Sequence, residues 1–223
     1  MIIRTLRLPL PLFLLMLSLS SVVPAQEKAI DLSHLPREGR LLADFTPPGW
    51  AVEEKADGDL TADGIADIAA ILVQSSSVPN AEEGQRILLV LVGGANGKFS
   101  LGGSNGELLM CVHCGGVKES ADVDIKKGVV IVNQLIGSRE FTDQIWRFRY
   151  AAKSRRFVLI GKDIRHGDGA LGTGKKESFN FLTGIKISES YRYDQKRDRE
   201  ITLSSKKEEI PKRTPFLEGV KME

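Results

Sequence analysis

The apolar residues of this chain fall in short runs, and no segment of helical length has a period near 3.6 residues. Residues Ile87 to Val92 are continuously apolar, as expected for a strand buried on both faces. From Ile145 to Tyr150, large apolar residues alternate with polar ones, which is typical of a strand with one buried face. Turn signals such as Asn96-Gly97 and Lys127-Gly128 separate neighbouring runs. The sequence therefore predicts an all-β fold, an antiparallel meander of about eight to ten strands in a single domain.

The first 25 residues have the features of a secretory signal peptide. Arg4 and Arg7 precede an apolar run from Leu8 to Leu19, and Val23-Pro24-Ala25 supplies a small-residue cleavage pattern. The apolar run is too short to span a bilayer. We therefore expect a protein that is exported, to the periplasm or the medium, with no membrane insertion once the signal is cleaved.

The charge balance argues against one class of partner. The full chain has 31 Lys and Arg residues and 29 Asp and Glu residues, and the signal peptide contains two of the arginines and none of the acids. The mature chain is therefore balanced, at 29 against 29. It lacks the positive excess of a nucleic-acid-binding protein, so we expect no nucleic-acid partner.

The mature chain divides into three parts by composition. Residues 26–48 are polar, contain prolines at 36, 47 and 48, and are predicted to form an irregular lead-in. Residues 49–193 contain the strand-like runs and are predicted to form the β domain. Residues 194–223 carry mixed charge with two prolines, and we predict a polar tail that is extended or poorly ordered.

Four aspartates and two glycines crowd the segment from Asp57 to Asp67. Counted from Asp59, carboxylates fall at positions 1, 5 and 9, with Thr61 at position 3 and Gly64 at position 6. Hard cations such as Ca²⁺ need several oxygen ligands on a tight loop, with glycine at the sharp turn. The segment is not an EF-hand, because position 12 is Ala70 and not glutamate. The alternative without a metal is a turn in which aspartates accept hydrogen bonds from backbone amides.

This loop resembles the Asp-x-Asn/Asp-x-Asp-Gly-x-x-Asp calcium loops of FG-GAP and VCBS-type repeats. The resemblance covers one repeat, residues 50–99, and includes the later Gly-Gly-Ala-Asn-Gly-Lys-Phe segment. It implies a fold related to propeller blades, although the chain is too short for a complete integrin-like propeller. The calcium ligands that it implies are the carboxylates of Asp59, Asp63 and Asp67 and the carbonyl oxygen of Ile65. Thr61 departs from the pattern, because its hydroxyl would be a weaker ligand than a carboxylate or amide oxygen. With this weaker fifth ligand, we expect a dissociation constant on the order of 10⁻⁴ to 10⁻³ M.

Cys111 and Cys114 are the only cysteines. In an exported chain such a pair is expected to form a disulfide. The loop is so short that the bond would stabilise the fold by only roughly 2 kcal/mol, as a local clip. Redox activity stays open, because Val112-His113 between the thiols resembles the dipeptide of oxidising disulfide enzymes. Zinc needs about four ligands, and the other histidines, His34 and His166, are distant in sequence.

The Cys-x-x-Cys-Gly-Gly segment, joined to one calcium-loop repeat, also resembles a group of uncharacterised bacterial exported proteins, which implies a fold but no activity. A further glycine-rich segment, Gly167 to Lys176, satisfies G-x-G-x-x-G and nearly matches a P-loop. Both nucleotide motifs require a helix afterwards, whereas Glu177 to Phe181 is strand-like. We interpret this segment as a mobile glycine loop.

Together these patterns predict a non-enzymatic exported protein with a calcium-stabilised loop that binds another protein or a cell-envelope component. The alternative from another class is a periplasmic thiol–disulfide oxidoreductase that uses Cys111 and Cys114. A third is a hydrolase, against which the scarcity of histidine counts, since only three are present.

Overall fold

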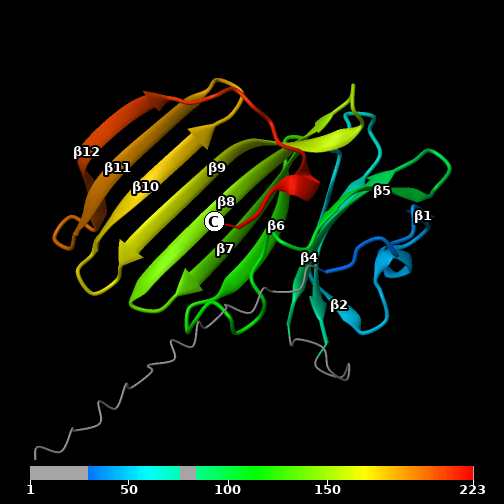
Figure 1. Ribbon diagram of the computed structural model, residues 1–223, viewed down its shortest axis with the longest axis horizontal. Helices are drawn as coiled ribbons and strands as arrows, with labels where there is room; N and C mark the ends of the chain where they lie inside the picture. Colours follow the sequence, from blue (N-terminus) through cyan, green and yellow to red (C-terminus); the bar gives the residue numbers. More distant parts are fainter. Residues whose placement is uncertain (1–29, 76–83, 223) are drawn as a thin grey trace, which may run out of the picture.

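The computed structural model describes residues 30–75 and 84–222 and consists of two antiparallel β-sheets in one domain (Figure 1). The predicted all-β meander is confirmed, since neighbouring strands in each sheet follow one another along the chain with few exceptions. Twelve strands are present in the described residues, more than the sequence predicted. The same residues contain no helix long and apolar enough to cross a bilayer. The predicted signal peptide, residues 1–25, lies outside the described part of the chain.

The smaller sheet has the strand order β1-β5-β4-β3-β2. Its strands are β1 (Glu38–Gly39), β2 (Trp50–Gly58), β3 (Asp67–Gln74), β4 (Arg86–Gly93) and β5 (Phe99–Asn105). A short 3₁₀ turn, η1 (Leu42–Phe45), lies between β1 and β2. The predicted Asn96-Gly97 turn joins β4 to β5, with the amide of Gly94 bonded to the carbonyl oxygen of Lys98.

The larger sheet has the order β12-β11-β10-β9-β8-β7-β6, an uninterrupted meander. Its strands are β6 (Ser120–Lys126), β7 (Val129–Gly137), β8 (Glu140–Ala151), β9 (Arg156–Asp168), β10 (Thr173–Asn180), β11 (Ile185–Asp194) and β12 (Arg199–Glu209). Figure 1 shows that β10, β11 and β12 extend beyond the smaller sheet. Their residues are mostly half-buried or exposed, because no second sheet covers them.

The main core lies between the smaller sheet and strands β6 to β9. Trp146 and Phe148 are fully buried and contact this core, while Arg149 on the opposite face of β8 is exposed. The alternation predicted for this strand is therefore confirmed. Phe157 in β9 pairs with Tyr150 and joins the same core, as the predicted hairpin requires.

A second core explains why β3 and β4 are apolar on both faces. The lead-in chain folds over the outer face of the smaller sheet, where Leu35 and Phe45 pack against Leu72, Leu89 and neighbouring apolar residues. Each of these side chains is less than about a tenth exposed. The continuous apolar run predicted for a doubly buried strand corresponds to β4, whose two faces contact different cores.

The glycine-rich segment predicted to be a mobile loop is mostly strand. Gly167 in β9 pairs with Gly174 in β10, and only the residues between Asp168 and Thr173 form a turn. The two glycines leave room for the ring of Tyr191, since a Cβ at Gly174 would lie 2.5 Å from the tyrosine hydroxyl oxygen. Close approach of an aromatic ring is a common reason for glycine within a strand. A strand, β10, follows this turn where a nucleotide motif would need a helix.

The mixed-charge segment after residue 193 is extended, one of the two states predicted for it. Strand β12 pairs with β11 along its length, apart from a bulge between Ser190 and Tyr191. After β12 the chain returns to the body of the molecule, where the 3₁₀ turn η2 (Leu217–Gly219) places Leu217 and Val220 in the main core. The carbonyl oxygens of both residues accept hydrogen bonds from the side-chain amide of Asn105. The C-terminal segment is thus part of the domain and not a separate tail.

Candidate functional site

The aspartate loop connects β2 to β3 and is held by hydrogen bonds to its own backbone. The carboxylate of Asp59 accepts the amide protons of Ala62 at 2.7 Å and Gly64 at 2.9 Å, which form the turn. These bonds, with that of Gly64 the strongest, lower the pKa of Asp59. Ala62 and Gly64 both have positive φ, at 62° and 82°, so the chain turns sharply here. Asp63 in turn accepts the amide proton of Ile65 at 2.9 Å.

Asp67 joins this loop to the end of β4, at the same end of the smaller sheet. Its carboxylate is fully buried and accepts the amide protons of Leu60, at 2.7 Å, and Gly93, at 2.8 Å. Burial raises the pKa of Asp67, although both hydrogen bonds act in the opposite direction. The backbone approaches closely at this point, since a Cβ at Gly93 would lie 2.4 Å from the carbonyl oxygen of Ala66.

The five predicted calcium ligands therefore lie in one loop, but their carboxylates serve the turn. Within the described residues, no three side chains of His, Cys, Asp or Glu form a group that could hold a metal ion. The carboxylate of Asp57, the fourth aspartate of this segment, pairs with the ammonium group of Lys55 at 2.8 Å. The hydroxyl of Thr61 is left over, because its oxygen is buried and makes no hydrogen bond to any residue that the structure describes. Calcium binding stays a prediction, and the hydrogen-bonded turn is the arrangement seen.

Cys111 and Cys114 form a disulfide, with Cα atoms 5.3 Å apart. The bridge closes a turn in which the amide of Cys114 bonds to the carbonyl oxygen of Cys111, and His113 has a positive φ of 66°. The residues that follow, up to β6, are turns and bends. The environment of a reactive cysteine at a helix N-terminus is therefore absent from the described residues around this pair. His34 and His166 do not join the two cysteines in a metal cluster within that part of the chain.

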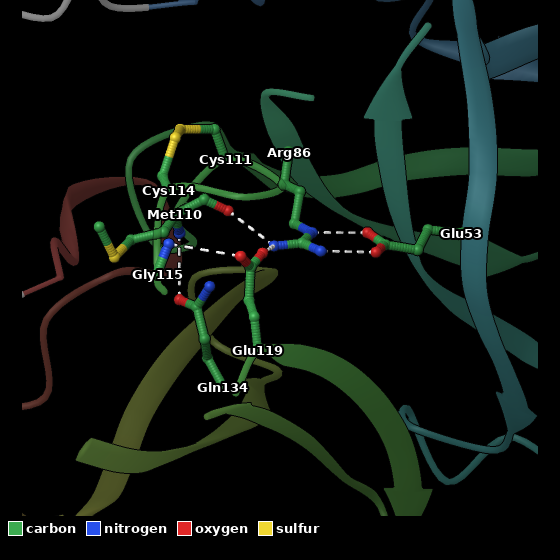
Figure 2. A network of polar contacts seen from close by, with 8 residues as sticks. All are labelled: Glu53, Arg86, Met110, Cys111, Cys114, Gly115, Glu119 and Gln134. Atoms are coloured by element: carbon green, nitrogen blue, oxygen red, sulfur yellow. Dashed lines mark hydrogen bonds and ion pairs between the residues drawn. A yellow bond between two sulfur atoms is a disulfide. The ribbon is translucent and has the colours of Figure 1, made fainter. Parts of the chain in front are cut away.

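A buried ionic network that the sequence reasoning missed fixes the residues flanking the disulfide (Figure 2). Arg86 in β4 is 4% exposed and donates to both carboxylate oxygens of Glu53 in β2, at 2.6 and 2.7 Å. Its other amino group donates to Glu119 at 2.7 Å and to the carbonyl oxygen of Met110 at 3.0 Å. Burial alone would lower the pKa of Arg86, but the hydrogen bonds that it donates to the two glutamates outweigh burial and raise the pKa.

This network connects both sheets through the disulfide segment. Glu119 immediately precedes β6, and its second carboxylate oxygen accepts the amide proton of Gly115 at 3.3 Å. The side-chain oxygen of Gln134, in β7, accepts the amide proton of Met110 at 3.0 Å. Met110 and Gly115, the two residues flanking the cysteine turn, are thus each held by a side chain from the larger sheet or its approach (Figure 2). The only sequence signal was an arginine beside the apolar run of β4, which is ambiguous without its partners.

No triad for nucleophilic catalysis forms among the described residues. The hydroxyl oxygen of Thr142 lies 2.9 Å from Nδ1 of His166, the kind of contact a nucleophile makes with its base. No carboxylate bonds to the other ring nitrogen in that part of the chain to orient the imidazole. His34 pairs instead with Asp31, at 3.3 Å and largely exposed.

A hollow of about 790 Å³ lies at the end of the larger sheet, between the β9–β10 and β11–β12 turns. We call it the aromatic hollow, because its lining includes the rings of Phe141, Tyr191 and Tyr193. Leu171 in the β9–β10 turn is 66% exposed beside it, and Tyr193 is 40% exposed. The aromatic hollow was not predicted, because its residues come from three separate strands and two turns.

The base of the aromatic hollow is held firmly. Tyr191 is buried, and its hydroxyl accepts a hydrogen bond from Arg165 at 3.0 Å. Arg165 and Lys176 both pair with the carboxylate of Glu200 in β12. Asp168 orders the β9–β10 turn by accepting the amide proton of Leu171 at 2.9 Å.

Comparisons with protein-family models, with curated proteins and with solved structures found no match.

Proposed function

We propose that this chain is an exported, non-enzymatic protein that binds another protein or a cell-envelope component through the aromatic hollow. The observation that carries the proposal is the exposure of Leu171, at 66%, beside a hollow lined by three aromatic rings. Interface cores are enriched in Tyr, Phe and Arg, and hot spots cluster in well-packed concave sites.

The position of the aromatic hollow supports this role. Strands β10 to β12 extend past the smaller sheet (Figure 1), so they contribute little to the main core. Their turns nevertheless hold exposed apolar side chains on a rigid base, where solubility alone would favour polar residues. Arg192 and Lys196 also line the aromatic hollow, and neither makes an ion pair within the described residues. These two cations suit a partner surface that is apolar with acidic groups at its edge.

The export part of the proposal rests on the sequence of residues 1–25, and the non-enzymatic part on the scarcity of histidine, of which the chain has three. The ordered disulfide segment supports a structural use of the cysteines, because its flanking residues are bonded to the Arg86 network.

The test compares two substitutions that each replace an exposed leucine by aspartate. The mature chain, Leu171→Asp and Leu41→Asp are each immobilised and exposed to an envelope extract of the producing cell. Leu41 is 64% exposed on the lead-in, so its substitution introduces the same charge at a matched exposure, far from the aromatic hollow. We expect a component that the wild-type chain and Leu41→Asp retain and that Leu171→Asp loses, and Tyr193→Ala to weaken the same retention.

Two results would overturn the proposal. One is that Leu171→Asp and Leu41→Asp retain the same components to the same extent. The other is that the wild-type chain retains nothing beyond an unrelated protein of equal charge.

A further inference from the structure

A second hollow, of about 500 Å³, lies on another part of the molecule where four chain segments converge. Its walls come from the lead-in, from β5, from the β8–β9 turn and from η2. We call it the arginine cleft, because Arg37, Arg155 and Arg156 line it. In Figure 1 the yellow-green β8–β9 turn lies near the red C-terminal turn that supplies its remaining charged residue, Glu218.

The charges of the arginine cleft are not balanced. Arg156 donates to the carboxylate of Glu218 at 2.9 Å, and its guanidinium stacks on the ring of Phe216 at 3.6 Å from the ring centre. Arg37 and Arg155 are both exposed and have no acidic partner within the described residues. Three arginines and one glutamate thus line the arginine cleft, which leaves two positive charges in one concave site.

The other walls favour a ligand with an anionic group and a small organic body. Ser104 of β5 lines the arginine cleft, and its hydroxyl makes no hydrogen bond to the described residues, so it is free to donate. Leu35 and Leu101 form an apolar wall. The short β8–β9 turn fixes the backbone of Arg155, whose amide bonds to the carbonyl oxygen of Ala151 at 2.8 Å. Planar guanidinium groups match the oxygens of phosphate and carboxylate in pairs.

We propose that the arginine cleft binds a small oxyanionic ligand with two negative charges, such as a phosphate monoester or a dicarboxylate, held by Arg37 and Arg155 with Arg156 fixed behind them. The cleft volume lies within the range of small-molecule sites. This site does not depend on the aromatic hollow, and either proposal stands if the other fails.

The test is calorimetric titration of the mature chain with inorganic phosphate, glycerol 3-phosphate and succinate, each at about 50 and 200 mM salt because screening weakens exposed contacts. Arg37→Gln and Arg155→Gln should each weaken binding by about tenfold or more, as expected for loss of a charge-assisted hydrogen bond. Arg149→Gln is the matched control, since Arg149 is an exposed arginine of β8 that does not line the arginine cleft.

A further variant tests the charge argument in the opposite direction. Glu218→Gln removes the only acid of the arginine cleft, so the affinity for the same probes should rise. Phosphate and succinate compete for one site if the shared oxyanion chemistry is right, and the preferred probe identifies the class of ligand. Absence of binding by all three probes at millimolar concentration would overturn the proposal. An equal loss in Arg149→Gln would do so too, because it would indicate attraction to the whole surface.

Discussion

Replacing Arg86 by methionine should destabilise the fold more than any substitution of an exposed charge. Methionine has a similar length and no charge, so Arg86→Met removes the shared donor and leaves Glu53 and Glu119 without it. The side chains of Glu53 and Glu119 are 25% and 9% exposed. Without the arginine, both carboxylates would keep a negative charge that water stabilises only in part. The carbonyl oxygen of Met110 also loses its donor.

The expected cost follows from the burial of the network. Removing one partner of a buried ion pair typically costs about 3 to 5 kcal/mol, because the remaining charge stays buried. The partial exposure of Glu53 lets water compensate in part, so we expect about 3 kcal/mol. In a domain of this size, that change should lower the melting temperature by roughly 6 to 12 °C.

Thermal and urea unfolding followed by circular dichroism would measure this loss. Lys221→Met is the matched control, because Lys221 pairs with Glu107 at 3.0 Å with the two side chains 65% and 41% exposed. Such surface pairs contribute at most about 1 kcal/mol. Adding Glu119→Gln to Arg86→Met should recover part of the loss, since it removes one of the stranded charges. A destabilisation by Arg86→Met no larger than that of Lys221→Met would refute the reasoning.

Three further predictions concern the loop, the disulfide and the acid response. Millimolar Ca²⁺ should raise the free energy of unfolding by roughly 0.4 kcal/mol if the dissociation constant is also millimolar. Asp63→Ala should remove this response, and Thr61→Asp should enlarge it. If calcium leaves the melting temperatures of both wild type and Thr61→Asp unchanged, the loop is a turn alone. Replacing Cys111 and Cys114 together by serine should cost roughly 2 kcal/mol or less, and wild-type turnover of insulin disulfides that this variant lacks would favour the oxidoreductase instead. Hydrogen bonds from Arg139 and from the backbone amides of Leu171 and Ala170 lower the pKa of Asp168 from 3.8 to about 2. The stabilising effect of its carboxylate is therefore complete above pH 4 and is lost as the pH falls through about 2. The melting temperatures of wild type and Asp168→Asn should converge over that interval, and a constant difference between them would contradict the assignment.

The strands were predictable where the sequence carries a local pattern. The alternation around Trp146 and Phe148 reflects burial of one strand face, and the continuous apolar run of β4 reflects burial of both faces. The spacing of apolar residues along the chain is enough to indicate either case. Strand β12 was not assigned as a strand because its composition is charged. Its pairing is supplied by β11, and its exposed position on a sheet edge is where charged residues are expected.

The sites were predictable only as far as their residues are neighbours in sequence. The turn around Asp59 and the Cys111–Cys114 bridge are local, and both were found. Arg86 is separated from each of its glutamate partners by 33 residues, so no short pattern reveals the network. The arginine cleft combines residues more than 60 positions apart, such as Arg156 and Glu218. Charge compensation of this kind depends on the pairing of strands, which a single sequence leaves open.

The role of Asp67 determines which experiments can distinguish a calcium loop from a turn. Its buried carboxylate bonds to the amides of Leu60 and Gly93, so it holds the loop against the β4–β5 end of the sheet whether or not a metal is present. Loss of Asp67 would leave two amides unpaired, at about 1 to 3 kcal/mol for each buried group. That loss would occur under either hypothesis and carries no information on calcium. Asp63 and Thr61 differ in this respect, because Asp63 is exposed and the buried Thr61 hydroxyl bonds to nothing in the described residues. Substitutions there change the ligand set while leaving the bonds of Asp67 intact, so the calcium dependence of their melting temperatures separates the two accounts.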